Sequence, residues 1–238
     1  MINRKSRDEI KRMKHAGHIV ALVHKAMKEN IKAGMSTKDL DDIAMEVIHA
    51  NKAVPTFLGY NGFPASICTS INENVVHGIP SKDVILKEGD IISVDVGATY
   101  GGMVGDSAWT YPVGKIAPEI ENLLKFTEES LFAGISQMRA GNVLDDISSA
   151  VESVANREHL GIVRQYGGHG VGDKTLIKSG MVIAIEPMLN LGCDEVIQLP
   201  DEWTVQTADK KPSAHFEHTV LATDGEPELM TIIREEFL

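Results

Sequence analysis

The chain has 238 residues, of which 43% are hydrophobic, and its formal net charge is −11. The hydrophobic content suffices for a sizeable core and excludes a largely disordered chain. The acidic balance, without a long run of lysine or arginine, argues against a nucleic-acid-binding protein. Two isolated cysteines, a charged start without an apolar signal core, and no apolar run of about 18 residues predict a cytoplasmic protein that does not span a membrane.

Helical patterns come first in the chain. Ser6 and Glu9 have the spacing of a capping box, and the apolar residues after them recur at helical spacing until Gly34, where we expect the helix to stop. A second helical pattern, "STKDLDDIAMEVIHAN", follows with its cap at the first or second residue. Residues 54–111 then contain short β-branched runs separated by Gly, Pro and Asn, which predict strands.

The same order returns in the second part of the chain, where two helical patterns precede several strand-like runs. The pieces Ala-Gly and Leu-Asp-Asp-Ile of "KAGMSTKDLDDIAMEVIHANKAV" recur in "RAGNVLDDISSAVESVANREHLGIV". This recurrence predicts one domain with two repeated halves, about 1–115 and 116–238; the alternative is two similarly capped amphipathic helices. Helices and strands in separate runs predict an α+β fold with antiparallel sheet covered by helices.

Two carboxylates lie in neighbouring strand-like runs of "SVDVGATYGGMVGDSAWTY", with the glycine pair 101–102 as the expected turn. A two-residue loop places Asp106 opposite Gly97 and diagonal to Asp95, whereas a loop shifted by one residue places the two carboxylates opposite each other. Both registers leave the two side chains on one face. Carboxylates so close together either share a proton or bind a cation between them.

Three later segments each place a potential ligand in an apolar or glycine-rich run: His169, Glu186 and Glu217. A carboxylate in such a strand is costly to bury unless it is paired or binds metal. Each residue alone also fits a turn, a packed histidine or a solvent-facing side chain. One imidazole with four carboxylates is, however, typical of a two-metal site that activates water, and this ligand set suits Mn(II), Fe(II), Co(II) or Zn(II).

These segments, in this order, resemble those of the bacterial type I methionine aminopeptidases, which have the pita-bread fold. The resemblance covers nearly the whole chain and is carried by "SINENVVHGIP", "GDIISVDVGATYGGMVGDSAWTY", "YGGHGVG", "GMVIAIEPMLN" and "WTVQTADKKPSAHFEHTVLAT". It implies a monomer that removes the initiator methionine from nascent proteins, with a metal-bound hydroxide attacking the first peptide carbonyl. A ribosome contact is expected for such a substrate, although the sequence has no basic extension for it.

The resemblance also implies a role for individual residues. By motif, two divalent ions are bound by Asp95, Asp106, His169, Glu186 and Glu217, with Asp106 and Glu217 bridging them. Glu186 is in addition the expected proton shuttle for the attacking water.

The substrate-facing residues follow from the same resemblance. His77 is expected to face the substrate and to help hold the scissile peptide. The pocket for the methionine side chain is expected to be walled by Phe57, Tyr60, Phe63 and Trp203, each of which also fits an ordinary core position.

One departure from the family concerns the segment after "GGHGVG". In the family a longer loop carries an aromatic-His-acidic-acidic-Pro run, with a second substrate-facing histidine. Here Glu186 follows His169 after only 17 positions, and "DKTLIKSG" has no histidine, aromatic residue or proline. Loss of one positioned donor can lower a rate by about 10²–10³. This shortening favours the alternative of an impaired enzyme, or of an inactive binding module on the same scaffold.

Two further expectations concern neighbouring chemistry. His215 lies two residues before Glu217 on the same strand face, and we expect it to contact a metal ligand rather than the metal. A proline-directed peptidase of the same fold is a lower-ranked alternative, because such chains typically carry an additional N-terminal domain.

Overall fold

The structure, a computed structural model, describes residues 4–165 and 174–237. The elements of the first part are α1 (Arg7–Asn30), α2 (Thr37–Ala50), β1 (Val54–Pro55), η1 (Tyr60–Gly62), β2 (Ile67–Ile71), β3 (Asn74–Val76), β4 (Ile91–Tyr100) and β5 (Met103–Pro112). Those of the second part are α3 (Pro118–Ser136), α4 (Leu144–Arg157), β6 (Gly161–Ile162), β7 (Val182–Ile185), β8 (Met188–Asn190), β9 (Val196–Gln198), β10 (Val205–Thr207), β11 (Ser213–His215), β12 (His218–Leu221), β13 (Glu228–Leu229) and η2 (Glu235–Phe237). Within these described ranges no helix is long and apolar enough to cross a membrane.

The first two helices begin at capping boxes. The amide of Glu9 donates to Ser6 Oγ, while the Glu9 carboxylate accepts from the Ser6 amide at 2.7 Å. Ser36 and Asp39 form the same reciprocal pair at the start of α2, which fixes the cap at Ser36. Each box satisfies amide groups that have no partner inside the helix, so the helix starts predicted from the sequence are confirmed.

The end of α1 differs from the expectation. The helix ends at Asn30 instead of near Gly34, because Ile31 leaves helical geometry with ψ of 121°. Gly34, with φ of 91°, belongs to the turn that leads into α2. The glycine therefore marks the connection between the helices and not the last helical turn.

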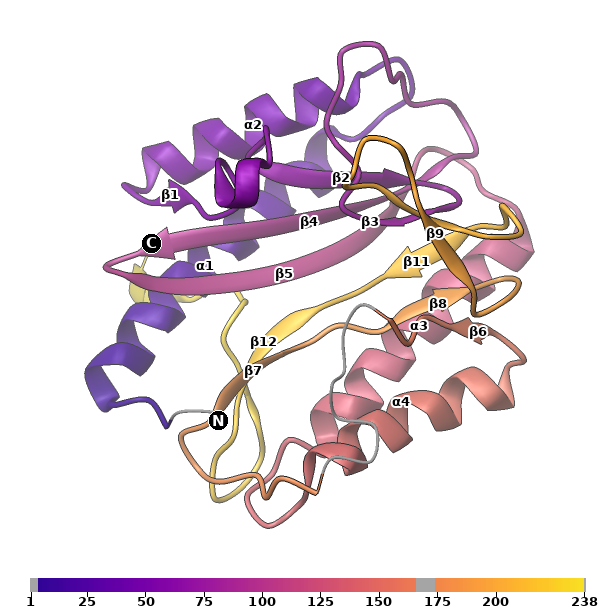
Figure 1. Ribbon diagram of the computed structural model, residues 1–238. Helices are drawn as coiled ribbons and strands as arrows, with labels where there is room; N and C mark the ends of the chain where they lie inside the picture. Colours follow the sequence, from indigo (N-terminus) through magenta and orange to yellow (C-terminus); the bar gives the residue numbers. More distant parts are fainter. Residues whose placement is uncertain (1–3, 166–173, 238) are drawn as a thin grey trace.

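The described strands pair antiparallel in four sheets. The largest has the order β1–β4–β2, with β5 also paired to β4, and the others are β3–β10–β9, β11–β8–β6 and β13–β12–β7. Figure 1 shows α1 and α2 side by side next to the β4–β5 hairpin, and α3 and α4 side by side next to β6, β8 and β11. This is the α+β architecture that the sequence predicts.

Each helix pair buries its apolar face against strands. One core cluster joins α1 and α2 to β4 and includes Ile19, Val23, Leu40, Ile48, Ile92, Val94 and Val96. The other joins α3 and α4 to the strands of the second part and includes Leu123, Leu131, Ile147, Ile185, Leu189 and Phe216. Trp109 on β5 packs against both clusters. The division of one domain into two repeated halves stays a prediction.

Strand β5 is held along β11 and β12, and this contact places the candidate site. The amide of Glu217 donates to the carbonyl of Ala108 at 2.8 Å. The amide of Asp106 donates to Thr219 Oγ1 at 3.1 Å, and the same hydroxyl donates to the carbonyl of Asp106 at 2.7 Å. Residues more than a hundred positions apart in the sequence therefore lie next to each other.

Candidate metal centre

The β4–β5 hairpin fixes the relative position of the first two carboxylates. Its turn has two residues, Gly101 and Gly102, both with positive φ as a type I′ turn requires. Asp106 is the ladder partner of Gly97 and thus lies diagonal to Asp95 on one face of the hairpin. Of the two registers that the sequence left open, the two-residue loop is the one observed.

Glu186 and Glu217 reach the same place from other strands. The ladder between β7 and β12 ends with the pair Ile185 and His218, so both glutamates lie just beyond that pair. Neither glutamate belongs to a strand. The alternation of side chains between the two faces of a sheet therefore does not fix the direction of their carboxylates.

Two groups of ligand atoms result from this arrangement. Oxygens of Asp95, Asp106 and Glu217 all lie within 4.8 Å of one another. Atoms of Glu186, His215 and Glu217 satisfy the same limit. Because Glu217 belongs to both groups, the two groups form one continuous centre. His169, the remaining expected ligand, lies outside the described residues.

The acidic oxygens lack a neutralising partner in the described part of the chain. Oδ1 of Asp95 and Oδ1 of Asp106 are buried and accept no hydrogen bond there. No lysine or arginine of the described residues forms an ion pair with them or with Glu186 or Glu217, and His215 lies 3.7 Å from Glu186. Buried, unpaired carboxylates are costly, and a divalent cation with oxygen-rich ligation removes that cost.

The electrostatics of the centre point the same way. Burial raises the pKa of Asp106 to about 7, and repulsion from Glu186 adds to this effect. Burial also raises the pKa of Asp95 and of Glu217 well above the ordinary range, with repulsion from Asp106 as the next cause for both. The pKa of Glu186 rises to about 7 through burial. Without a cation, the centre therefore holds protons at a pH where isolated carboxyl groups have none.

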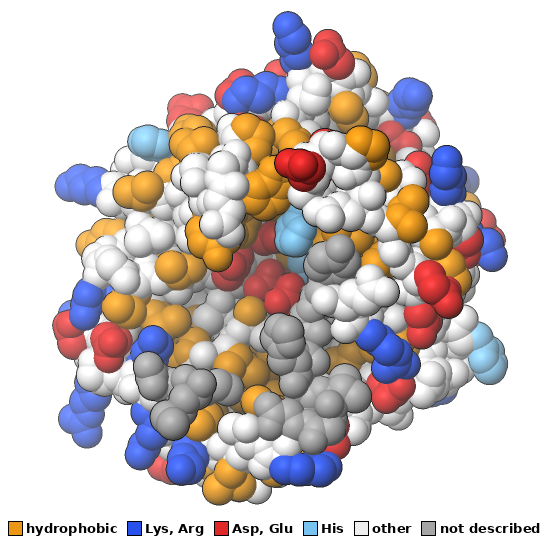
Figure 2. Space-filling view, viewed as in Figure 1, with side chains coloured by type: hydrophobic (Ala, Val, Ile, Leu, Met, Phe, Trp, Pro, Cys, Tyr) orange, Lys and Arg blue, Asp and Glu red, His pale blue; other side chains and the backbone are white. Residues whose placement is uncertain are grey.

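The surface above this centre is hollowed. Figure 2 shows acidic side chains and a histidine at the floor of a depression in the middle of this face, with hydrophobic side chains around it and basic ones toward the edges. An acidic floor with an apolar rim suits a ligand that carries a positive charge and an apolar side chain.

His77 lies next to the centre in an unusual backbone conformation. Its φ is 59°, in the left-handed region that residues with a side chain rarely adopt. Burial lowers the pKa of His77. Burial also lowers the pKa of His215, to about 3, and the charge of His77 is the second cause of that shift. The two imidazoles are thus close in space, and a strained residue beside an ionisable cluster is typical of a functional site.

The aromatic residues expected to form a pocket are brought together only in part. Phe63 is buried and meets Trp203 edge-to-face at 5.0 Å between ring centroids, and Phe57 packs in the same cluster. A Cβ on Gly97 would lie 2.7 Å from Phe57 Cε1, so this glycine leaves room for the ring beside the carboxylates. Tyr60 is 65% exposed and is not part of this cluster.

Cys68 belongs to this cluster although the sequence did not single it out. It is buried with Phe63 and is the ladder partner of Asp95 on the neighbouring strand. Burial raises the pKa of the Cys68 thiol, and the charge of Asp95 adds to this effect. To place the thiol beside Asp95, one must know that β2 pairs with β4. The alternation of residue types along β2 alone does not give this pairing.

The segment that follows the uncharacterised stretch around His169 is held at the start of α4. The amide of Ile177 donates to the carbonyl of Asn142 at 2.8 Å, and the amide of Leu144 donates to the carbonyl of Thr175 at 3.1 Å. Ile177 is buried in the second core cluster. The short segment "DKTLIKSG" therefore connects to β7 through defined contacts from its second residue onward.

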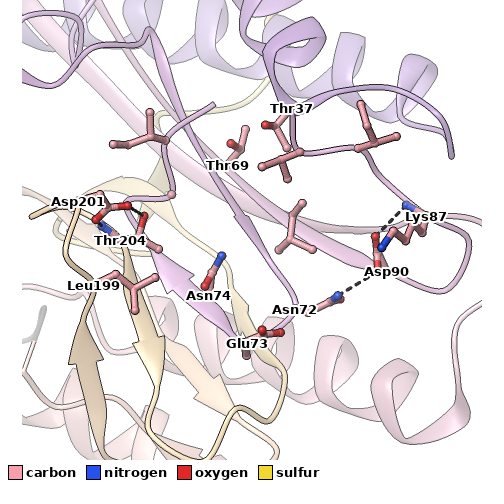
Figure 3. A pocket seen from close by; sticks show the side chains of 15 residues that line it. Thr37, Thr69, Asn72, Glu73, Asn74, Lys87, Asp90, Leu199, Asp201 and Thr204 are labelled. Atoms are coloured by element: carbon pink, nitrogen blue, oxygen red, sulfur yellow. Dashed lines mark hydrogen bonds between the residues drawn. The ribbon is translucent and has the colours of Figure 1, made fainter. Parts of the chain in front are cut away.

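A second pocket differs from the metal centre in its polar groups. Its volume is about 410 Å³, and residues of β2, β3 and the turn before β10 line it (Figure 3). Two of the three acids that line it have local partners: Asp90 accepts from Asn72 Nδ2, and Asp201 accepts from the hydroxyl of Thr204 at 2.6 Å. Buried carboxylate oxygens without a hydrogen-bond partner distinguish the metal centre, which is why we assign the chemistry there.

Comparison with known proteins agrees with this assignment. Residues 11–224 match the model of metallopeptidase family M24. The chain belongs to metallopeptidase family M24. This M24 chain is 47% identical to "Methionine aminopeptidase 1" of Bacillus subtilis, over 97% of its own length and 99% of the relative's. It is 35% identical to the methionine aminopeptidase of Escherichia coli, over 99% and 96% of the two chains.

Solved structures of two other peptidases have the same fold. The crystal structure of methionine aminopeptidase from Thermotoga maritima superposes with a TM-score of 0.95 at 35% identity, covering 98% of this chain and all of that one. The prolidase of Pyrococcus furiosus, at 18% identity, superposes with a TM-score of 0.75 and is covered to 66%, which shows a common fold only. The expected pita-bread fold is confirmed.

Proposed function

We propose that this chain is a metal-dependent aminopeptidase that removes the N-terminal methionine of nascent proteins. The observation that carries the proposal is the convergence of four carboxylates, two of which have buried oxygens without a hydrogen-bond partner, beside an apolar, aromatic-lined cluster. Full-length relatives named methionine aminopeptidase support the choice of substrate.

The proposed metal ligands follow the two groups of atoms. Asp95, Asp106 and Glu217 would hold one divalent ion, and Glu186 and Glu217, with His169, would hold a second, Asp106 and Glu217 being the ligands expected to serve both. When bound, the ions would activate a water molecule and polarise the peptide carbonyl. The orphan oxygens of the aspartates and the raised pKa values support this ligand set. The identity of the ions is open among Co, Mn, Fe and Zn.

Glu186 is the proposed proton carrier. Its side chain is 37% exposed, whereas that of Glu217 is buried, so a substrate can reach Glu186 more readily than Glu217. Burial raises its pKa to about 7, which allows it to accept and release a proton near neutral pH. It would take the proton of the attacking water and pass it to the departing amine.

Binding of the methionine residue is assigned to the neighbouring groups. The flexible thioether fits the cluster of Phe57, Phe63 and Trp203, since sulfur packs favourably against aromatic rings. We propose that His77 holds the scissile peptide, because it is close enough to His215, beside the centre, to help lower the pKa of that imidazole. Tyr60 stays a predicted pocket residue, and its exposure places it at the rim.

The decisive experiment removes one proposed bridge. The variant Asp106→Asn keeps the size of the side chain but loses its charge. We expect its turnover of a Met-Ala-Ser peptide, with added Co(II) or Mn(II), to fall more than about 100-fold. Mutation of residues that only hydrogen-bond a metal ligand already lowers metal affinity or activity by about 10–100-fold. Asp42→Asn is the matched control, since Asp42 is 66% exposed on α2 and pairs only with Lys38. Equal turnover of Asp106→Asn and wild type would exclude the proposed centre.

The alternatives are weaker. Nothing in the comparisons favours an inactive binding module, and the match to prolidase extends to the fold alone. Hydrolysis of Xaa-Pro peptides in preference to Met-Ala would nevertheless revive the proline-directed alternative. A cytoplasmic location, a monomeric state and a ribosome contact remain predictions.

A further inference from the structure

His215 is a buried histidine whose ring nitrogen has no partner among the described residues. Its side chain is 2% exposed, and Nε2 is out of contact with solvent and makes no hydrogen bond there. The backbone is fixed on both sides, because the His215 amide donates to Thr110 Oγ1 at 2.9 Å and the same hydroxyl donates to the His215 carbonyl at 2.8 Å. The backbone of His215 is thus fixed, and its imidazole is buried where Nε2 lacks a partner among the described residues.

The nitrogen faces the metal centre. Nε2 lies 3.7 Å from Glu186 Oε2, and both atoms lie within 4.8 Å of an oxygen of Glu217. A distance of 3.7 Å is too long for the hydrogen bond by which an imidazole would orient a carboxylate. Two ligands of one ion, each bound at about 2.1 Å, can be as far apart as about 4.2 Å, so both atoms reach a common cation.

A cation at this point satisfies three groups at once. The imidazole nitrogen gains the partner that it lacks, and the two glutamates lose their mutual repulsion. The sequence led us to expect that His215 contacts a metal ligand rather than the metal; it does lie 3.7 Å from Glu186, but at that distance it does not orient the carboxylate by a hydrogen bond. Imidazole is a common ligand of Zn(II), Co(II) and Fe(II).

We propose that His215 Nε2 is a direct ligand of the divalent ion bound by Glu186 and Glu217. The inference rests on the proposed metal centre and adds to it a nitrogen donor from β11, beside the one expected from His169. It also predicts a metal preference, because imidazole suits Zn(II) and Co(II) whereas carboxylates suit Mn(II).

The first test compares His215→Gln with His218→Gln. His218 is a buried histidine three residues away whose Nδ1 lies 2.6 Å from Thr231 Oγ1, and it belongs to neither ligand group. Metal-free protein is titrated with Co(II) and with Mn(II) by calorimetry, and the Co(II) absorption bands are recorded. We expect His215→Gln to lose at least about 10-fold in Co(II) affinity, with altered bands and a smaller loss for Mn(II), and the His218 variant to match wild type.

A second measurement does not depend on the folding of a His215 variant. In the variant His169→Gln loaded with Mn(II), electron spin-echo spectroscopy should still detect coupling to an imidazole nitrogen, and this coupling should vanish when His215→Gln is added. Absence of the coupling in His169→Gln overturns the proposal, as does a folded His215→Gln with wild-type Co(II) affinity and absorption bands.

These readouts separate the inference from the proposed function. Cleavage of Met-Ala-Ser by wild type tests the function, whereas the titrations and the spin-echo spectra test the ligand. If wild type binds no Co(II) or Mn(II), both fail. If wild type cleaves the peptide and the His215 signals are absent, the inference alone is wrong.

Discussion

The metal-free chain should lose stability as the pH rises toward neutrality, and Asp106 should be a main cause. Burial and the charge of Glu186 raise the pKa of Asp106 from 3.8 to about 7, so the folded state holds a proton that the unfolded state releases. Stability from this group is therefore fully present below pH 3.8 and is lost as the pH rises through about 7. At 1.36 kcal/mol per pKa unit, the loss between about pH 5 and pH 7.5 is at most about 2.5 kcal/mol.

Urea unfolding of chelator-treated protein at several pH values measures this loss. The comparison is with Asp106→Asn, whose neutral side chain has no proton to release and should make the unfolding free energy less dependent on pH. Adding Mn(II) should have the opposite pH dependence in wild type, because the ion competes with the protons and stabilises the chain more at pH 7.5 than at pH 5. The reasoning would be refuted if the unfolding free energy of metal-free wild type fell no more between these pH values than that of Asp106→Asn.

Two further variants test how the site is held. Ser107→Ala removes the hydroxyl that donates to the Glu217 carbonyl. It should lower the unfolding free energy by about 1 kcal/mol and weaken Co(II) binding. The control Ser136→Ala removes a similar hydrogen bond inside α3 and should leave Co(II) affinity unchanged. Phe63→Ala should lower kcat/KM for Met-Ala-Ser by about 10- to 200-fold, mainly through KM, because it opens the aromatic cluster. Phe132→Ala, on the exposed side of α3, is its control, and an equal effect of both variants would contradict the pocket assignment.

Local patterns in the sequence predict local structure well here. The capping box of Ser6 and Glu9 and the glycine turn at 101–102 depend only on residues a few positions apart, and both occur as expected. The turn then sets the hairpin register, and the register sets the diagonal relation of Asp95 and Asp106. The relative position of Asp95 and Asp106, two of the four described carboxylates of the site, therefore follows from the local sequence.

The rest depends on contacts between distant segments. The hydroxyl of Ser107 donates to the carbonyl of Glu217, 110 positions later in the sequence. The alternation of apolar and polar residues around either position does not predict that these two segments lie together. The same holds for Cys68, whose position beside Asp95 follows from the pairing of β2 with β4. The expected roles of Glu186 and Glu217 came from family resemblance, which supplies such long-range information indirectly.

The acidic centre also bears on how the two groups of elements are held together. Asp95 and Asp106 come from the hairpin covered by α1 and α2, whereas Glu186 and Glu217 lie at the ends of strands that pack with α3 and α4. Without a cation, their charges oppose the hydrogen bonds that hold β5 along β11 and β12, since like charges repel across that contact. An ion shared between the two pairs of carboxylates replaces this repulsion with attraction to the ion. Metal binding should therefore stabilise the contact between β5 and the strands β11 and β12. Amides of β12 should therefore exchange hydrogen more slowly in the metal-loaded chain than in the metal-free chain, with little change in α2.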